Sequence, residues 1–254
     1  MNTNELRKYW KSEEEKAVMT GWDFSYIEGR FSSEEDSLPW DMTAVIDKYR
    51  RDNYRLLDID TGGGEFLLSL GHPYALTSAT EGFPPNAALC QEKLGGLGID
   101  FREMSVYSEM PFPDGSFDIV TDRHGSYDAD EVFRVLKTGG YFITQQVGED
   151  NDCELVELLL PGAPKRFKGH CLRRCADEMK SAGFDIIESG EAFRPISFFD
   201  TGALVWFAKI IEWEFTGFSV DKCFERLIAA EEMIRRYGSV SGRIHRFYIA
   251  ARKN

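Results

Sequence analysis

Acidic side chains and glycines are concentrated in one short run, Asp58-Ile59-Asp60-Thr61-Gly62-Gly63-Gly64. The apolar residues before it predict a buried strand, the glycines predict a turn, and the apolar residues after it predict the start of a helix. Glycines in such a turn let the backbone pass close beneath a ligand. A second strand-like run, residues 74–79, is followed by Glu81, and an acid at this position can bind both hydroxyls of a ribose. Together these features indicate a nucleoside ligand.

Three classes of nucleoside cofactor compete for a glycine turn after a first strand. A triphosphate loop needs lysine after the last glycine, where Glu65 stands, and a dinucleotide fingerprint that starts at Gly62 needs glycine in place of Leu67. The carboxylates of Asp58, Asp60 and Glu65 bracket the turn. They would repel a pyrophosphate but favour an ammonium or a sulfonium.

The charge of the chain bears on its partners. The formal net charge is −13, and an acidic surface repels phosphate backbones, which makes nucleic acid an unfavourable partner. The one basic cluster, between residues 165 and 174, is small and is better explained as a solvated helix face. We therefore expect a small molecule or a protein as the partner. The sequence specifies no oligomeric state.

Composition bounds the class of protein. With 254 residues and 43% hydrophobic content, the chain can bury the core of one large domain. No apolar run approaches the length of a membrane span, and the first residues lack the features of a secretion signal. Five cysteines without framework spacing predict free thiols in a reducing cytoplasm. His170, Cys171 and Cys175 lack a fourth ligand nearby, so we predict no metal site.

The expected elements define four segments. Within residues 51–192, short β-rich runs alternate with helical segments, a pattern typical of an α/β domain with a parallel sheet. The expected strands are 56–59, 74–79, 99–103, 117–122, 141–147 and 184–189, with a last strand at 243–250 inside the segment 241–254. Residues 1–50 are expected to be a helical extension, with Ser12 and Glu15 as a capping box.

Residues 193–240 are expected to hold two helices, at 201–212 and 221–237. All five tryptophans lie in this segment or in residues 1–50. Ligands of open α/β sheets bind beyond the carboxyl ends of the strands, so these two segments could cover that edge as a lid. Equally, they could only cover the flank of the sheet.

Four motifs in order resemble those of one family. The run from Asp58 to Gly64 looks like the D-x-G-x-G-x-G motif of class I S-adenosylmethionine-dependent methyltransferases, and Glu81 stands where their ribose acid stands. The run Met-Pro-Phe-x-Asp-x-x-Phe-Asp-Ile-Val at 110–120 resembles their approach to the fourth strand. The run Glu-Val-Phe-Arg-Val-Leu-Lys-Thr-Gly-Gly at 131–140 resembles their approach to the fifth. The resemblance covers residues 51–192 and points to an uncharacterised bacterial branch.

The resemblance implies a Rossmann-like fold, with a mostly parallel seven-stranded sheet, an antiparallel last strand and helices on both faces. It also implies S-adenosylmethionine as the cofactor, with the ribose at Glu81, the adenine beside Val106 and Tyr107, and the sulfonium above Asp122. The full set of expected cofactor-binding residues is Asp58, Asp60, Thr61, Gly62, Gly63, Gly64, Glu81, Gly82, Val106, Tyr107 and Asp122.

Two residues depart from the family pattern. Asp60 stands in place of a glycine, and aspartate tolerates a positive φ better than most residues do. Its carboxylate could contact the methionine ammonium or block the pocket. Val106 stands where many relatives have an acid for the adenine amino group, which leaves backbone groups to hold the adenine.

Methyl transfer from a sulfonium is an in-line displacement that depends mainly on alignment and on exclusion of water. A general base is needed only if the acceptor must lose a proton, and His124, just after the fourth strand, is the candidate. A surface or structural role for His124 is the alternative. Arg123 could bind an acidic substrate or pair with Asp122 or Asp128.

Further substrate candidates are Gln146, at the end of the fifth strand, and the aromatic residues Trp22 and Trp206. The tryptophans could form a wall over the sulfonium by cation–π contact, or they could be ordinary hydrophobic packing. The leading hypothesis is an S-adenosylmethionine-dependent methyltransferase that acts on a small molecule. The alternatives are a methyltransferase of RNA or protein, and a non-catalytic binding or scaffold protein with a degenerate motif.

Overall fold

The computed structural model describes residues 1–18 and 24–254. The chain forms two compact units, each assembled from three segments. The core unit consists of Pro39–Gly148, His170–Ala192 and Arg246–Asn254. The helical unit consists of Met1–Leu38, Glu149–Gly169 and Phe193–His245.

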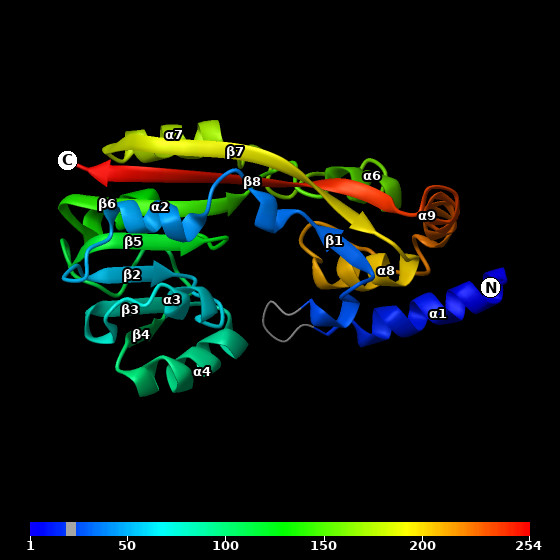
Figure 1. The fold of residues 1–254 in the computed structure, drawn as a ribbon, viewed down its shortest axis with the longest axis horizontal. Helices are drawn as coiled ribbons and strands as arrows, with labels where there is room; N and C mark the ends of the chain where they lie inside the picture. The colour runs from blue at the N-terminus through cyan, green and yellow to red at the C-terminus, as the bar shows by residue number, and fades with distance from the viewer. Residues whose placement is uncertain (19–23) are drawn as a thin grey trace. The chain divides into compact units, whose positions relative to one another are not determined.

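The strands form one sheet in the order β1-β7-β8-β6-β5-β2-β3-β4 (Figure 1). Their bounds are β1 Phe31–Ser33, β2 Leu56–Ile59, β3 Thr77–Glu81, β4 Asp100–Glu103, β5 Phe117–Arg123, β6 Leu136–Val147, β7 Phe184–Phe198 and β8 Val240–Lys253. The pairs β2–β3, β3–β4, β2–β5 and β5–β6 are parallel, and β8 is antiparallel to β6. The predicted mostly parallel sheet with an antiparallel last strand is confirmed.

The structure also contains an eighth strand that the sequence did not predict. The short strand β1 pairs antiparallel with the end of β7, with Phe31 opposite Phe198. It lies within the 1–50 segment that was expected to be helical. Otherwise that segment is largely helical, with α1 at Thr3–Lys16 and α2 at Met42–Tyr49.

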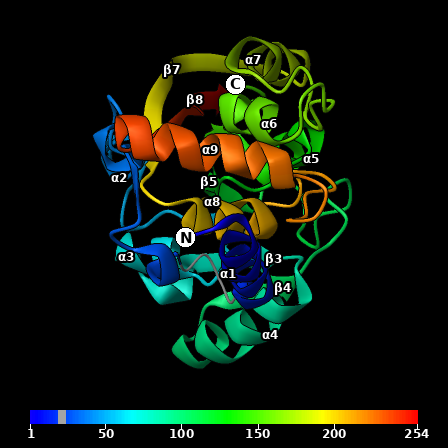
Figure 2. The ribbon, with the colours of Figure 1, turned by 90° about the vertical axis from the view of Figure 1, so that its right-hand side faces the viewer.

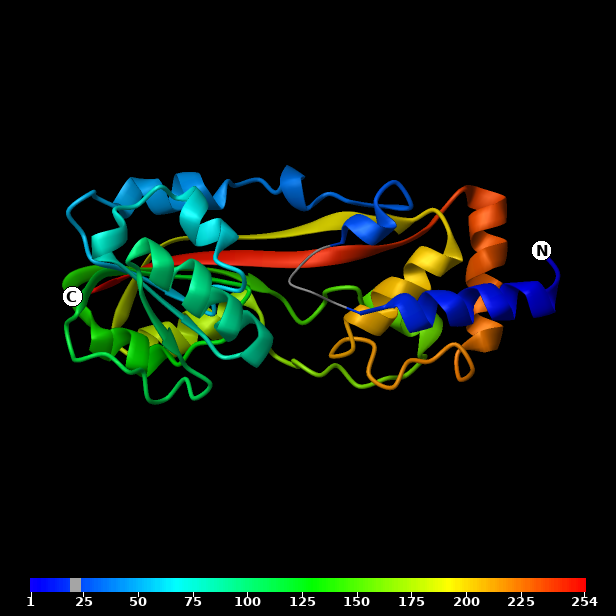
Figure 3. The same cartoon turned by 90° about the horizontal axis from the view of Figure 1, so that it is seen from below.

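Helices cover both faces of the sheet in the core unit, as predicted (Figure 3). Alternate residues of a strand point to opposite faces. Leu57 of β2 therefore packs in one apolar cluster with Met179 of α7, while Leu56 packs in another with Ile46 of α2. The helices of this unit, besides α2, are α3 Glu65–Ser69, α4 Pro84–Lys93, α5 Ala129–Val135 and α7 Leu172–Ser181. Burial of both faces makes the sheet a rigid base for the loops at its edge.

The first helix is capped differently from the prediction. The side chain of Asn2 accepts hydrogen bonds from the amides of Asn4 and Glu5, and the side chain of Glu5 accepts one from the amide of Asn2. This reciprocal pair is the capping box of α1. The predicted box at Ser12 is therefore wrong, because Ser12 lies inside the helix.

The helical unit has its own apolar core. Its helices are α1, α6 Cys153–Leu159, α8 Thr201–Ile210 and α9 Phe224–Tyr237, and α8 lies between α1 and α9 (Figure 2). The side chains of Trp10 and Trp206 are buried in this core. No helix among the described residues is long and apolar enough to cross a membrane.

A partly buried charge network joins two of the three segments of the helical unit. Glu13 of α1 is only 2% exposed and lies 2.9 Å from the Arg30 guanidinium. Arg30 Nε also donates to Asp200 at 2.7 Å, and Asp200 caps α8 by accepting from the amide of Ala203. Because a buried carboxylate is costly without a partner, Arg30 stabilises the unit through both acids.

We expect Arg30→Met to lower the free energy of unfolding by about 3 kcal/mol, because it removes the cation that Glu13 and Asp200 share and leaves only the more exposed Lys16 beside Glu13. Lys48→Met is the matched control, since Lys48 pairs with Glu188 at 2.9 Å on an exposed surface. Its cost should stay below about 1 kcal/mol. Urea-induced unfolding of both variants measures the difference, and equal losses would contradict this account of the network.

Candidate functional site

Three buried carboxylates lie at the carboxyl ends of neighbouring strands in the core unit. Asp58 is in β2, Glu81 ends β3, and Asp122 is in β5, opposite Ile59 in the sheet register. Their exposed fractions are 3%, 5% and 0%. Parallel strands bring these ends to one edge of the sheet, where ligands of this fold class bind.

The glycine-rich turn follows β2 and has an unusual backbone. Asp60, Gly62 and Gly64 have φ values of 50°, 63° and 78°, in the left-handed region. Gly64 is required on steric grounds as well, since a Cβ there would lie 2.9 Å from a methyl group of Leu94. The turn therefore needs glycine for its backbone conformation. The amides of Thr61, Gly62 and Gly64 donate to acceptors within the protein.

Glu81 fastens the turn to the end of β3. Its Oε2 accepts from the Gly62 amide at 2.7 Å, and its Oε1 accepts from the amides of Gly82 and Phe83 at 2.9 and 2.8 Å. Burial raises the pKa of this carboxyl. A carboxylate oxygen has two lone pairs, so Oε2 can accept a further hydrogen bond, as a ribose hydroxyl would require.

Asp58 lies in the strand just before the turn, and Thr61 lies within the turn. Thr121 of β5 donates to Asp58 Oδ1 at 2.7 Å, and the Thr61 amide donates to the carbonyl of Thr80 at 2.9 Å. Burial raises the pKa of Asp58 to about 6, and the nearby charge of Asp60 acts in the same direction. Gly63 also belongs to the turn, and its carbonyl accepts from Lys93 at 2.9 Å.

Asp60 links two loops across the site. Its Oδ2 accepts from the Tyr107 hydroxyl at 2.6 Å and from the Ser126 amide at 3.0 Å. A Cβ on Gly125 would lie 2.4 Å from the Cβ of Asp60, so glycine is needed there. Among the described residues, the buried Asp60 Oδ1 has no hydrogen-bond partner. Burial raises the pKa of Asp60.

Asp122 is held by a buried polar network. It accepts from Thr144 Oγ1 at 2.7 Å, from the Gly125 amide at 3.1 Å and from the side-chain amide of Gln146. Burial, together with the charges of Asp60 and Asp58, raises its pKa well above the usual range. Gln146, expected at the substrate, is 4% exposed and lies within this network.

The chain turns sharply after β5. His124 has a φ of 65°, and its Nε2 lies 2.9 Å from the side-chain nitrogen of Gln145. Arg123 is exposed, and its guanidinium lies 4.9 Å from the centre of the Phe66 ring. Arg123 and His124 therefore lie at the same edge as the carboxylates.

The remaining predicted residues are more scattered. Val106 is 53% exposed, next to Tyr107. Trp206 belongs to the helical unit and is 2% exposed, with its ring stacked on Tyr26 at 5.6 Å. Most of its surface is therefore covered by protein. Trp22 lies outside the described residues.

Sequence reasoning did not identify Thr121, Gly125 or Ser126 as residues of this site. Thr121 follows Val120 within a strand, and threonine is common in strands, so its hydroxyl gave no indication of a functional role. The Gly125-Ser126 pair after β5 was the available clue to a close backbone approach.

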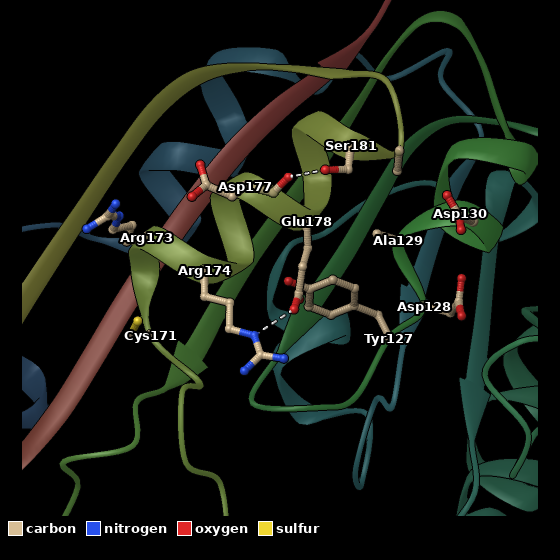
Figure 4. A pocket seen from close by; sticks show the side chains of 11 residues that line it. Tyr127, Asp128, Ala129, Asp130, Cys171, Arg173, Arg174, Asp177, Glu178 and Ser181 are labelled. Carbon is tan, nitrogen blue, oxygen red and sulfur yellow. Dashed lines mark hydrogen bonds and ion pairs between the residues drawn. The ribbon is translucent and has the colours of Figure 1, made fainter.

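A separate surface hollow of about 690 Å³ lies between the start of α5 and α7 (Figure 4). Its walls include Tyr127, Asp130 and Arg174, and Arg174 pairs with Glu178 at 3.0 Å. None of its lining residues belongs to the predicted site. Within residues 1–18 and 24–254, no three or more His, Cys, Asp or Glu side chains are arranged so that they could hold a metal ion.

Comparison with known proteins identifies the kind of domain that the core unit resembles. Residues 57–144 match the family model described as a methyltransferase domain. The chain is 33% identical over 116 residues to demethylmenaquinone methyltransferase of Thermus thermophilus, covering 42% of this chain and 53% of that protein. It is 32% identical over 125 residues to phthiotriol/phenolphthiotriol dimycocerosates methyltransferase 1 of Mycobacterium ulcerans, covering 44% of each. The chain thus spans about half the length of these curated relatives.

Solved structures share the fold. YcgJ of Bacillus subtilis superposes with a TM-score of 0.56 at 18% identity, covering 84% of this chain and 97% of YcgJ. An S-adenosylmethionine-dependent methyltransferase of Methanosarcina mazei has a TM-score of 0.50 at 17% identity, covering 82% and 96% of the two chains. At such identities the likeness establishes the architecture.

We expect Tyr107→Phe to lower the free energy of unfolding by about 1–2 kcal/mol, because the partly buried Asp60 carboxylate loses a charged hydrogen bond. Its neighbour provides the control: Val106→Ala removes only exposed methyl groups and should cost less than about 0.5 kcal/mol. Urea-induced unfolding compares the two. A Tyr107→Phe variant as stable as wild type would show that the hydroxyl contributes nothing to this link.

Proposed function

Because the α/β core of this chain is a class I S-adenosylmethionine-dependent methyltransferase domain, we propose that the protein methylates a small-molecule acceptor with S-adenosylmethionine. The observation that carries the proposal is the arrangement of the glycine turn and the buried carboxylates at one sheet edge. Glu81 supplies acceptors for ribose hydroxyls, and the turn supplies room for close backbone approach.

The charge of the site fits a cationic ligand. Asp58, Asp60, Glu81 and Asp122 lie close enough that the charge of Asp60 raises the pKa of each of the other three. A bound cation would relieve this repulsion. S-adenosylmethionine carries an ammonium and a sulfonium, and when bound it supplies a methyl group on an activated leaving group. The buried Asp60 Oδ1 is suited to accept from the ammonium.

Two observations support a small molecule as the acceptor. The net charge of −13 opposes nucleic acid, and the curated relatives are named for demethylmenaquinone and for phthiotriol and phenolphthiotriol dimycocerosates. Exposed Arg123 can bind an acidic group of the acceptor, with His124 beside it.

All five cysteines are free thiols, which supports a reducing compartment such as the cytoplasm.

Titration calorimetry with S-adenosylmethionine and S-adenosylhomocysteine, with NADH as the control ligand, tests the proposal. We expect saturable binding of the adenosyl ligands alone, and a loss of more than about 100-fold in affinity for Glu81→Ala and Gly62→Val. Glu103→Ala is the matched control, because Glu103 is an exposed acid opposite Glu81 in the sheet register. Failure of wild type to bind would favour a scaffold in which Asp60 fills the pocket.

The affinity for S-adenosylmethionine should rise between pH 5 and pH 7. Below its pKa of about 6, Asp58 is protonated and contributes no negative charge, so binding of a cation must release a proton. The rise should be up to about tenfold per pH unit and should level off above the pKa. Asp58→Asn should remove the part of this pH dependence that comes from Asp58. A wild-type affinity that does not change between pH 5 and pH 7 would contradict the prediction.

A further inference from the structure

Three side chains of the core unit form a row that ends at His124. The Trp40 indole N–H donates to Gln145 Oε1 at 2.8 Å, and Gln145 Nε2 lies 2.9 Å from His124 Nε2. Gln145 is 2% exposed, and the ring of Trp40 packs 4.9 Å from that of Tyr248. The row is therefore fixed by packing as well as by hydrogen bonds.

Donor and acceptor chemistry determines the orientation of each group. An indole N–H can only donate, so the oxygen of the Gln145 amide must face Trp40. The NH₂ group of that amide then faces His124. Because an amide NH₂ can only donate, His124 Nε2 must accept, and the proton of the neutral imidazole must be on Nδ1.

The surroundings of His124 favour the same state. Its backbone amide donates to the Gln145 carbonyl at 2.8 Å, so Gln145 binds both its main chain and its side chain. Burial lowers the pKa of His124 well below its usual range. The charged groups acting on the imidazole are Arg123 of β5 and Arg246 of β8, and both disfavour an imidazolium.

We propose that Gln145, oriented by Trp40, is a positioning residue that holds His124 as a neutral imidazole with its proton on Nδ1. In this state Nε2 does not take a proton from the methyl acceptor. The tautomer of His124 is inferred from the hydrogen bonds alone. Its consequence for methyl transfer rests on the proposed function.

The consequence concerns the chemical class of the acceptor. If Nε2 removes no proton, the site suits a nucleophile that is already anionic near neutral pH, such as a phenolate, an enolate or a thiolate. The new bond from nucleophile to methyl then forms as the carbon–sulfur bond breaks, with its electron pair remaining on sulfur. The charges of nucleophile and sulfonium cancel, and no proton has to move.

Nitrogen-15 NMR of histidine-labelled protein tests the proposal directly. The chain has four histidines, and the spectrum of His124→Gln assigns the signal of His124. We expect an unprotonated Nε2, a protonated Nδ1 and no titration near the ordinary pKa of a histidine. A signal that titrates near the ordinary value of about 6.5, or a proton on Nε2, would overturn the proposal.

Gln145→Glu is the matched variant, because it keeps the shape of the side chain and replaces the NH₂ donor with an acceptor. The carboxylate would accept from a protonated Nε2 while still accepting from Trp40. We expect the pKa of His124 to rise by at least about one unit. A His124 titration that the variant leaves unchanged would show that Gln145 does not set its state. The wild-type measurement decides the tautomer even if the variant does not fold.

The same samples separate the two proposals. Titration of the labelled protein with S-adenosylhomocysteine reports cofactor binding independently of the His124 tautomer. A protein that shows the Nδ1–H tautomer but binds no S-adenosylhomocysteine would refute the proposed function and retain the assignment of Gln145. The opposite result would retain the function and leave His124 available as a general base.

Discussion

Four carboxylates crowded at one edge of a parallel sheet are the constraint on which the site depends. Burial raises the pKa of all four, and the charge of Asp60 raises the pKa of Asp58, Glu81 and Asp122 further. The fold offsets this cost with donors from its own backbone and side chains, among them the amide of Gly62. These donors hold the carboxylates in place, and the negative charge that remains would favour a cation over an anion at this edge.

The parts of this arrangement that follow from local sequence were predictable. The strand at Leu56–Ile59 has the predicted bounds, because a short apolar run before glycines has few alternatives. Alignment of parallel strands then places Asp58, Glu81 and Asp122 at one edge without further information. The antiparallel direction of the last strand followed only from the resemblance to a known family, and the structure confirms it.

The parts that depend on distant contacts were not predictable. Asp60 accepts hydrogen bonds from Tyr107 and Ser126, which lie in two separate loops. No periodic pattern in the sequence indicates that these loops meet at Asp60. Strand β1 is three residues long, too short for an alternating pattern, and its formation depends on pairing with β7. The predicted capping box at Ser12 was wrong although its residue types fit the motif. The helix already begins after Asn2, so Ser12 lies inside it.

The sheet order also has a consequence for the nascent chain. Strand β8 is synthesised after β6 and β7, yet it lies between them in the sheet. Until β8 leaves the ribosome, β6 and β7 each present an unpaired edge with apolar residues, and such edges invite aggregation. Synthesis of this protein therefore includes an interval, while α8 and α9 are translated, in which the edges of β6 and β7 that β8 will join are still unpaired.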